Sequence, residues 1–281
     1  MSTSTPAADG GAASEDARRE AAAWATWQES PWGRLRYRVL AALLRERCAR
    51  LGPAPLRVLD AGGGDGRDAL QLALAGHEVT VLDTSADVLG AARAAAAAAG
   101  VGDRVRTVAA DLEDLTALAA LTRHRAGGSG SFDVVLCHDV LQHRGSLAQV
   151  GADVAVLASS LRPGGLLSLM APNPAADVLT AALRDGPAQA WVLLDAERGA
   201  DPGTGRSVLR LDPAVVEAAA VDAGCEVDGR AGVLTVTTLL EEAQRTDERV
   251  VADLEELEVE LGRREEFRRT ARFWHLVARR R

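Results

Sequence analysis

The feature that most constrains this 281-residue chain is a run of glycines between an apolar segment and an amphipathic one. In "LRVLDAGGGDGRDALQLA" (56–73), Gly62, Gly63, Gly64 and Gly66 follow an apolar run that ends in Asp60. Glycine permits sharp turns and lets a ligand approach the main chain closely. The pattern therefore predicts a buried strand, a ligand-binding turn and a helix.

Strand and helix patterns alternate along most of the chain. Strands are expected at 56–60, 78–83, 104–111, 132–139 and 166–171, with helices at 67–76, 85–100 and 146–161. A helix at 213–223, a strand at 232–238, a helix at 239–264 and a strand at 273–280 follow. Earlier helical patterns at 17–27 and 35–51 indicate an N-terminal helical cap. The fold class is therefore α/β, a doubly wound, mostly parallel seven-stranded Rossmann-like sheet.

Residues 18–281 are expected to form one domain behind a disordered tail at 1–17, where small polar residues predominate. The helix and strand patterns weaken at about 173–207, after the fifth strand. We interpret this stretch as an insertion over the ligand site that acts as a lid or substrate platform. Its segment "ERGADPGTGRS" is expected to be a loop.

Charge and cysteine usage limit the partners. The net charge of −8 argues against binding nucleic acid by bulk charge, although it leaves room for a local basic patch. Three widely spaced cysteines offer no metal-ligand pair and suit a reducing cytoplasm. No apolar segment of the sequence is long enough to cross a membrane. We expect a cytoplasmic protein with no metal and no membrane partner.

The pattern from Asp60 to Gly66, D-x-G-x-G-x-G, resembles the class I S-adenosylmethionine-dependent methyltransferases. This resemblance implies that the glycines lie under the methionine part of S-adenosylmethionine and that Asp83 binds its ribose hydroxyls. The stretch from Gly64 to Ala69 also fits the dinucleotide motif G-x-G-x-x-A, for which Asp83 would suit NAD. Asp60 and Asp65 would repel a pyrophosphate but attract a sulfonium and an ammonium group, which favours the methyltransferase.

Several segments are similar to bacterial tRNA 5-carboxymethoxyuridine methyltransferases. They are "LRVLDAGGG", "AGHEV", "LRPGGLLSLM" before Asn173, and the C-terminal "ELEVELGRREEFRRTARFWHLVARR". The motif and the resemblance together imply these cofactor-binding residues: Arg36, Asp60, Gly62, Gly63, Gly64, Asp83, Ala110, Asp111 and His138. For Asp111, a helix N-cap is an equally good interpretation.

The narrower resemblance implies a methyl ester formed on the carboxylate of a modified wobble uridine in tRNA. A carboxylate needs a positive clamp, for which Arg206 and Arg210 are candidates because the family's lysine run and tyrosine are missing before Asp212. An amine or phenol would need a base, and His138 or His143 is the candidate. A small-molecule methyltransferase and a non-catalytic module that binds through its charged C-terminal helix remain alternatives.

Overall fold

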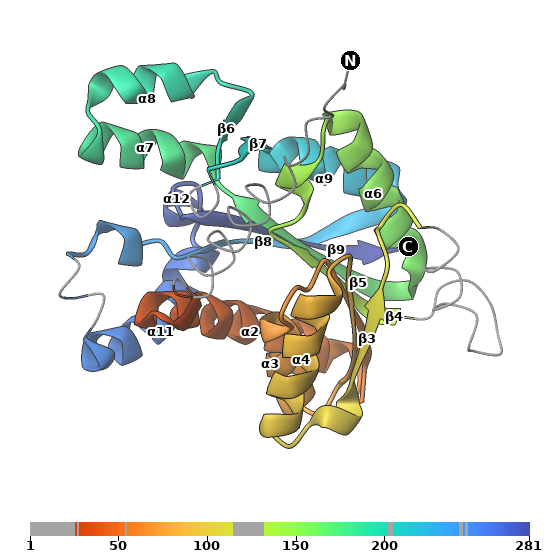
Figure 1. Cartoon of the computed structure of the whole chain (residues 1–281). Coiled ribbons are helices and arrows are strands. Elements are labelled where there is room, and N and C mark those ends of the chain that lie inside the picture. Colours follow the sequence, from red (N-terminus) through yellow and green to blue (C-terminus); the bar gives the residue numbers. More distant parts are fainter. Residues whose placement is uncertain are drawn as a thin grey trace, which may run out of the picture.

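The computed structural model describes residues 26, 28–53, 55–114, 132–201, 205–241, 244 and 247–281. Its centre is a seven-stranded sheet of order β3-β2-β1-β4-β5-β9-β8 (Figure 1). The first five strands in this order are parallel, and β9 is antiparallel to both β5 and β8. The predicted mostly parallel sheet is therefore confirmed. The strands are β1 (Arg57–Ala61), β2 (Glu78–Asp83), β3 (Val105–Ala109), β4 (Phe132–His138), β5 (Leu161–Pro172), β8 (Cys225–Val233) and β9 (Phe273–Arg280).

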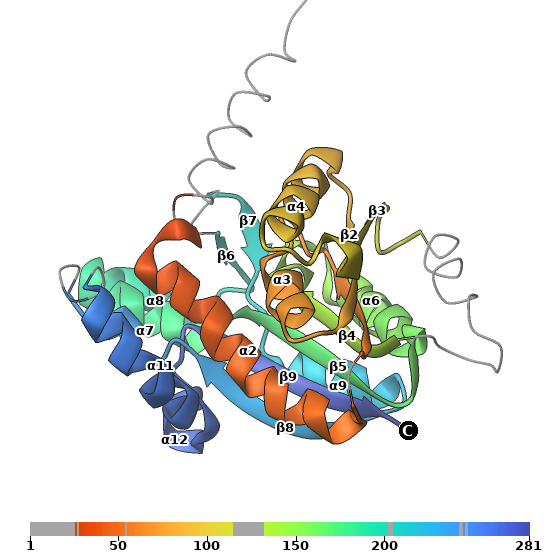
Figure 2. The same cartoon turned by 90° about the horizontal axis from the view of Figure 1, so that it is seen from below.

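Helices cover both faces of the sheet, and each face has its own apolar core (Figure 2). Alternate residues of a strand point to opposite faces, so Val134 and Leu136 join one core while Val135 and Cys137 join the other. The first core contains residues of α2 (Pro31–Leu51), α3 (Arg67–Leu74), α4 (Ala86–Ala98) and α11 (Glu248–Arg263). The second contains residues of α6 (Leu147–Ser160) and α9 (Pro213–Asp222).

The predicted N-terminal cap is present as α2, which begins four residues before the expected start at 35. Ser30 is its N-cap and accepts a hydrogen bond from Gly33 N at 3.0 Å, while Pro31 occupies the first helical position. The tail at 1–17 and nearly all of the helix expected at 17–27 lie outside the described residues. Within the described ranges, no helix combines the length and apolar character needed to cross a bilayer.

The insertion after β5 is more regular than expected. It contains α7 (Pro174–Arg184), α8 (Pro187–Leu194) and a hairpin of β6 (Arg198–Ala200) and β7 (Ser207–Leu209), which project beyond the sheet (Figure 1). The expectation of a loop throughout "ERGADPGTGRS" was wrong, because the two ends of this segment pair as β6 and β7. Trp191, Val192 and Leu194 on α8 are exposed, so the helix shows no clear amphipathic pattern in the sequence.

Two boundaries near the C-terminus also differ from prediction. The strand expected at 232–238 is β8, which ends at Val233, and the helix expected at 239–264 begins only at Glu248. Leu234 adopts a positive φ of 61°, and the next three amides bind the carboxylate of Glu258 instead of a neighbouring strand. The remaining short helices are η1 (Gly102–Arg104), η2 (Leu141–His143), η3 (Thr237–Leu239) and α12 (Glu265–Arg268).

Candidate active site

The glycine loop lies where β1 ends and α3 begins. Gly62, Gly64 and Gly66 all have φ between 54° and 76°, a region that side chains disfavour. A Cβ on Gly62 would lie 2.4 Å from Val140 Cγ2, and one on Gly63 would lie 2.6 Å from the Asp60 carboxyl. A Cβ on Gly64 would meet no protein atom within 4 Å. The protein's own packing thus requires Gly62 and Gly63, while the open side of Gly64 fits an approaching ligand.

Two substitutions separate these roles. Gly64→Ala is expected to reduce cofactor binding while costing about 1 kcal/mol of stability from backbone strain. Gly62→Ala is expected to cost about 2–4 kcal/mol, because overpacking against Val140 adds to the strain. Thermal unfolding and calorimetric titration would measure both effects. Wild-type cofactor affinity in the folded Gly64→Ala protein would show that no ligand approaches this position.

Asp83 ends β2 beside this loop, as expected for a ribose-binding carboxylate. Its Oδ2 accepts from Gly64 N at 3.0 Å and its Oδ1 accepts from Ser85 N at 2.9 Å. These two amides fix the orientation of the carboxylate, and each carboxylate oxygen has a further lone pair. The side chain is partly exposed and so remains able to bind two vicinal hydroxyls.

Arg36 connects the helical cap to the carboxyl edge of the sheet. Its buried guanidinium lies 3.4 Å from Asp68 Oδ2 on α3 and 2.5 Å from Asp139 Oδ2 just after β4. It also lies 4.5 Å from the ring centre of Tyr37. Burial favours the neutral form, but Asp139 and Asp68 outweigh that effect and raise the pKa of Arg36. The arginine is therefore a permanent buried cation at this edge.

The buried polar atoms near this cation that have no hydrogen-bond partner among the described residues include Arg36 Nε, Asp60 Oδ2 and Asp139 Oδ1. Burial, and then the charge of Asp68, raise the pKa of Asp60 well above its ordinary value. The methionine part of S-adenosylmethionine carries one carboxylate and one ammonium group. The ammonium group would donate a hydrogen bond to Asp60, and the carboxylate would accept one from Arg36. These residues therefore fit the methionine part of S-adenosylmethionine.

His138 lies at the carboxyl end of β4, but its side chain is buried in a chain of hydrogen bonds. Its Nδ1 lies 3.0 Å from Asp68 Oδ2, and its Nε2 lies 2.9 Å from Ser168 Oγ. Ser168 Oγ in turn lies 2.8 Å from Nε2 of His275 on β9. Burial raises the pKa of Asp68, but Arg36 and His138 lower it by more, so that the pKa is about 2. An ionised Asp68 assigns the Nδ1 proton to His138, whose Nε2 then accepts from Ser168.

Ala110 and Asp111 follow β3 at the same edge. Ala110 N donates to Asp83 O at 3.0 Å, which places this turn beside the β2 end. Asp111 Oδ1 accepts from Glu113 N at 2.9 Å and lies 3.5 Å from Arg144 Nη2. The bond to Glu113 N forms a local turn, as the capping interpretation implies, while the side chain stays about half exposed. The turn that contains Asp111 thus lies beside the end of β2, and an adenine contact remains a prediction.

The two arginines proposed as a substrate clamp have different surroundings. Arg210 donates from Nη1 to Leu193 O and to Ala196 O, and from Nη2 to Pro174 O. Its side chain is 5% exposed, and its guanidinium ties together the ends of α7 and α8 at the wall of a cavity of about 1250 Å³. A role as a clamp stays a prediction. Arg206 is exposed next to β7. His143, the other candidate base, is exposed at the end of η2.

Four polar residues at this edge were not predicted from the sequence: Asp68, Asp139, Ser168 and His275. The available signal was a polar residue inside an apolar strand, as in "LLSLMA" and "FWHLVA". Asp139 also adopts a positive φ of 57°, which is rare outside glycine. Its backbone N donates to Met170 O at 2.9 Å, and its carboxylate binds Arg36.

Sequence comparison places the chain among methyltransferases. A family described as a methyltransferase domain matches residues 58–165. The tRNA 5-carboxymethoxyuridine methyltransferase of Escherichia coli K12 is 33% identical over 250 residues, which cover 88% of each chain. The ubiquinone biosynthesis O-methyltransferase of Xanthomonas axonopodis is 38% identical over 135 residues, covering 47% of this chain and 50% of that protein.

Structural comparison agrees. The 1,6-didemethyltoxoflavin-N1-methyltransferase of Burkholderia thailandensis, solved with S-adenosylhomocysteine, has a TM-score of 0.56. The match covers 99% of this chain and 93% of that one at 18% identity, so it shows the fold alone. The glycine loop, the strand order and the long sequence match together identify the chain as a class I S-adenosylmethionine-dependent methyltransferase, in the sequence family that includes the E. coli tRNA 5-carboxymethoxyuridine methyltransferase.

Proposed function

We propose that this methyltransferase esterifies the carboxylate of 5-carboxymethoxyuridine in tRNA. The observation that carries the proposal is the 33% identity over 88% of the chain to an enzyme of that name. S-adenosylmethionine supplies an electrophilic methyl group, whose bond to sulfur breaks as a carboxylate oxygen bonds to the methyl carbon. The chain's own task is to align the two groups and exclude water.

The surroundings of His138 support a nucleophile that needs no base. Both of its ring nitrogens are engaged, by Asp68 and Ser168, and its side chain is 2% exposed. An amine or phenol must lose a proton as it reacts, and His138 has no free nitrogen to receive one. A carboxylate is already ionised at neutral pH, so this arrangement does not hinder it.

The charge of the insertion favours a second candidate, methylation of a small molecule. Residues 174–211 contain four arginines and five acidic residues, so this part of the molecule is not basic. A tRNA-binding surface usually concentrates positive charge to neutralise phosphates. The partial match to ubiquinone biosynthesis O-methyltransferases gives this alternative a sequence basis.

One assay separates the two candidates. Purified protein and S-adenosylmethionine would be incubated with tRNA that carries 5-carboxymethoxyuridine, with tRNA that lacks it, and with a metabolite extract. S-adenosylhomocysteine release measures turnover, and mass spectrometry of the digested nucleosides locates the methyl group. The proposal predicts turnover with the first tRNA alone. Turnover only with the metabolite extract would show that the substrate is a small molecule and not tRNA.

Salt dependence gives an independent prediction for an RNA substrate. Binding of phosphates by arginines releases counterions, so affinity falls steeply as salt is added. We expect the KM for tRNA to rise about tenfold or more between roughly 50 and 200 mM salt. The affinity for S-adenosylmethionine, measured in the same series, serves as the control and should change little. A flat KM profile would contradict extensive contact with the tRNA backbone.

A further inference from the structure

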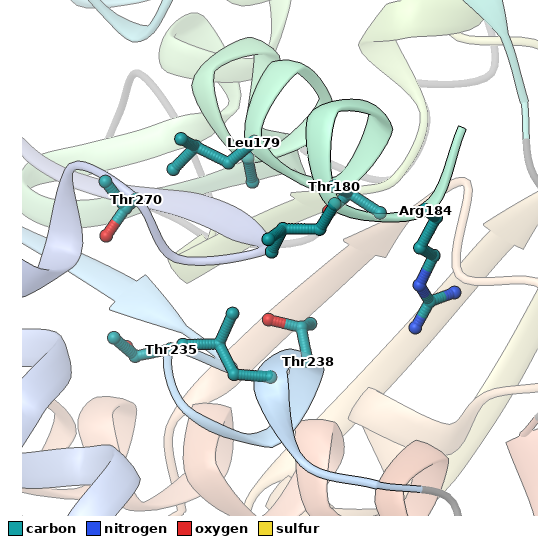
Figure 3. Close-up of a pocket in the computed structure, with 9 residues that line it drawn as sticks. Leu179, Thr180, Arg184, Thr235, Thr238 and Thr270 are labelled. Carbon is teal, nitrogen blue, oxygen red and sulfur yellow. The ribbon is translucent and has the colours of Figure 1, made fainter. Parts of the chain in front are cut away.

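A small cavity lies between the insertion and the turn that follows β8. Its volume is about 80 Å³. One wall is formed by Leu179, Thr180 and Arg184 of α7, and the other by Thr235, Thr238 and Thr270 (Figure 3). Because α7 follows the end of β5 and Thr270 precedes β9, the cavity lies at the carboxyl end of β5. The glycine loop and His138 follow the same ends of the neighbouring parallel strands.

The turn that forms one wall is held in an unusual conformation by a buried carboxylate. Glu258 on α11 is fully buried and accepts from the backbone N of Thr235, Val236 and Thr237 at 2.5–2.9 Å. It also accepts from Thr237 Oγ1 at 2.6 Å. Leu234, immediately before this turn, has the positive φ of 61°. Such strain persists only where the surroundings enforce it, and it is common at ligand sites.

Two polar groups at the cavity have no partner among the described residues. Thr235 is only 7% exposed, and its hydroxyl oxygen is buried without a hydrogen bond. Arg184 is exposed at the end of α7, and no ion pair or hydrogen bond of its side chain is found within the described ranges. A buried hydroxyl without a partner is unfavourable, so a ligand that bonds to it gains affinity.

The chemistry of the lining selects an anion. The lining includes one arginine and four threonines, of which Thr270 donates its hydroxyl to Phe267 O, and no acidic residue is among the lining residues. Its volume suits a group of a few atoms and is too small for a nucleobase. The geometry points to a seat for the carboxylate of the methyl acceptor, with Arg184 pairing the charge and Thr235 donating to one oxygen. This inference rests on the proposed function, because it assigns the acidic part of that substrate.

Binding tests the cavity without requiring turnover. Saturation-transfer NMR in the presence of S-adenosylhomocysteine would compare three probes: 5-carboxymethoxyuridine, 5-methoxyuridine and uridine 5′-monophosphate. We expect the carboxylate probe to bind, 5-methoxyuridine to bind at least about tenfold more weakly, and Arg184→Gln to abolish the difference. Preference for the monophosphate would assign the cavity to a phosphate and overturn the inference.

Thr235→Val tests the inference more directly than Arg184→Gln does. It replaces the unpartnered hydroxyl with a methyl group, so a purely structural role predicts equal or higher stability and unchanged kinetics. The carboxylate seat predicts a loss of about tenfold in kcat/KM and in probe affinity, with Thr235→Ser restoring both. Arg45→Gln, which removes an exposed charge on α2, is the matched control for Arg184→Gln.

These experiments can refute the carboxylate seat and the proposed tRNA substrate separately. Probe binding that depends on Arg184 and Thr235, without turnover of any tRNA, would refute the tRNA substrate and leave the carboxylate seat in place. Turnover of tRNA that is unchanged in Arg184→Gln and Thr235→Val would refute the seat and leave the proposed function in place. Absence of carboxylate binding by the wild-type protein would also overturn the seat.

Discussion

Replacement of Asp83 by alanine is expected to weaken S-adenosylmethionine binding by about a hundredfold. The carboxylate ends β2, and Gly64 N and Ser85 N hold it in place for the two ribose hydroxyls. A hydrogen bond to a charged group contributes roughly 1.5–3 kcal/mol, and two such bonds are lost together. Since about 1.4 kcal/mol corresponds to a factor of ten, a hundredfold loss is the lower part of this range.

Calorimetric titration of the wild-type and variant proteins would measure this loss. Asp87→Ala, which removes a carboxylate from the first turn of α4, is a nearby control for the change in net charge. Circular dichroism would show whether the variant stays folded. Unchanged binding in a folded Asp83→Ala protein would contradict the assignment of the ribose site, and tight binding of NAD by the wild-type protein would favour a dinucleotide instead.

The features that could be predicted from the sequence are the local ones. The glycine loop was identifiable because four glycines interrupt a strand–helix pattern, and Asp83 because it ends the next strand. Both inferences depend only on residues close in the sequence and on the rule that parallel strands present ligands at their carboxyl ends. The sheet followed from the repeat of these units.

The buried network of side-chain hydrogen bonds that links Arg36 to His275 could not be predicted, because it depends on pairing between distant strands. Ser168 and His275 are 107 positions apart, and they meet because β9 lies antiparallel to β5 with Met170 opposite His275. No local pattern encodes that register. The same holds for Asp139, which is 103 positions from Arg36.

The surroundings of Arg210 could not be predicted from the sequence for a related reason. Charge alone marked Arg210 as a possible partner for a carboxylate, but the sequence did not show the two helices of the insertion. Its guanidinium donates hydrogen bonds to three backbone carbonyls at the ends of those helices. Arg184, 26 positions earlier in the insertion, lies at the small cavity, while Arg210 lies at the wall of a larger one. The exposure and the hydrogen bonds of an arginine depend on the folded insertion and therefore cannot be inferred from its charge alone.

Replacement of Arg36 by methionine is expected to have the largest effect on stability, about 3–5 kcal/mol. The guanidinium is buried between Asp68 and Asp139, with its Nη2 2.5 Å from Asp139 Oδ2. Without it, two carboxylates remain in a buried site that also contains Asp60. Removal of one partner of a buried charged group is costly because the other charge stays desolvated.

The pH dependence of stability should change with this substitution. In the wild-type protein the pKa of Asp68 is lowered to about 2 from an ordinary value of 3.8, mainly because Arg36 and His138 outweigh burial. A lowered pKa means that the folded state binds the proton less readily than the unfolded state. The stabilisation is therefore fully present above about pH 4 and is lost as the pH falls toward 2.

Without Arg36, burial becomes dominant and should raise the pKa of Asp68, so the variant should gain relative stability as the pH falls from 7 to 5. Urea unfolding at several pH values would measure this for both proteins. Arg38→Met is the control, because Arg38 is on the same helix but pairs with Glu255 at a more exposed position. A loss below 1 kcal/mol in Arg36→Met, or the same pH profile in both proteins, would show that the buried carboxylates do not depend on this arginine.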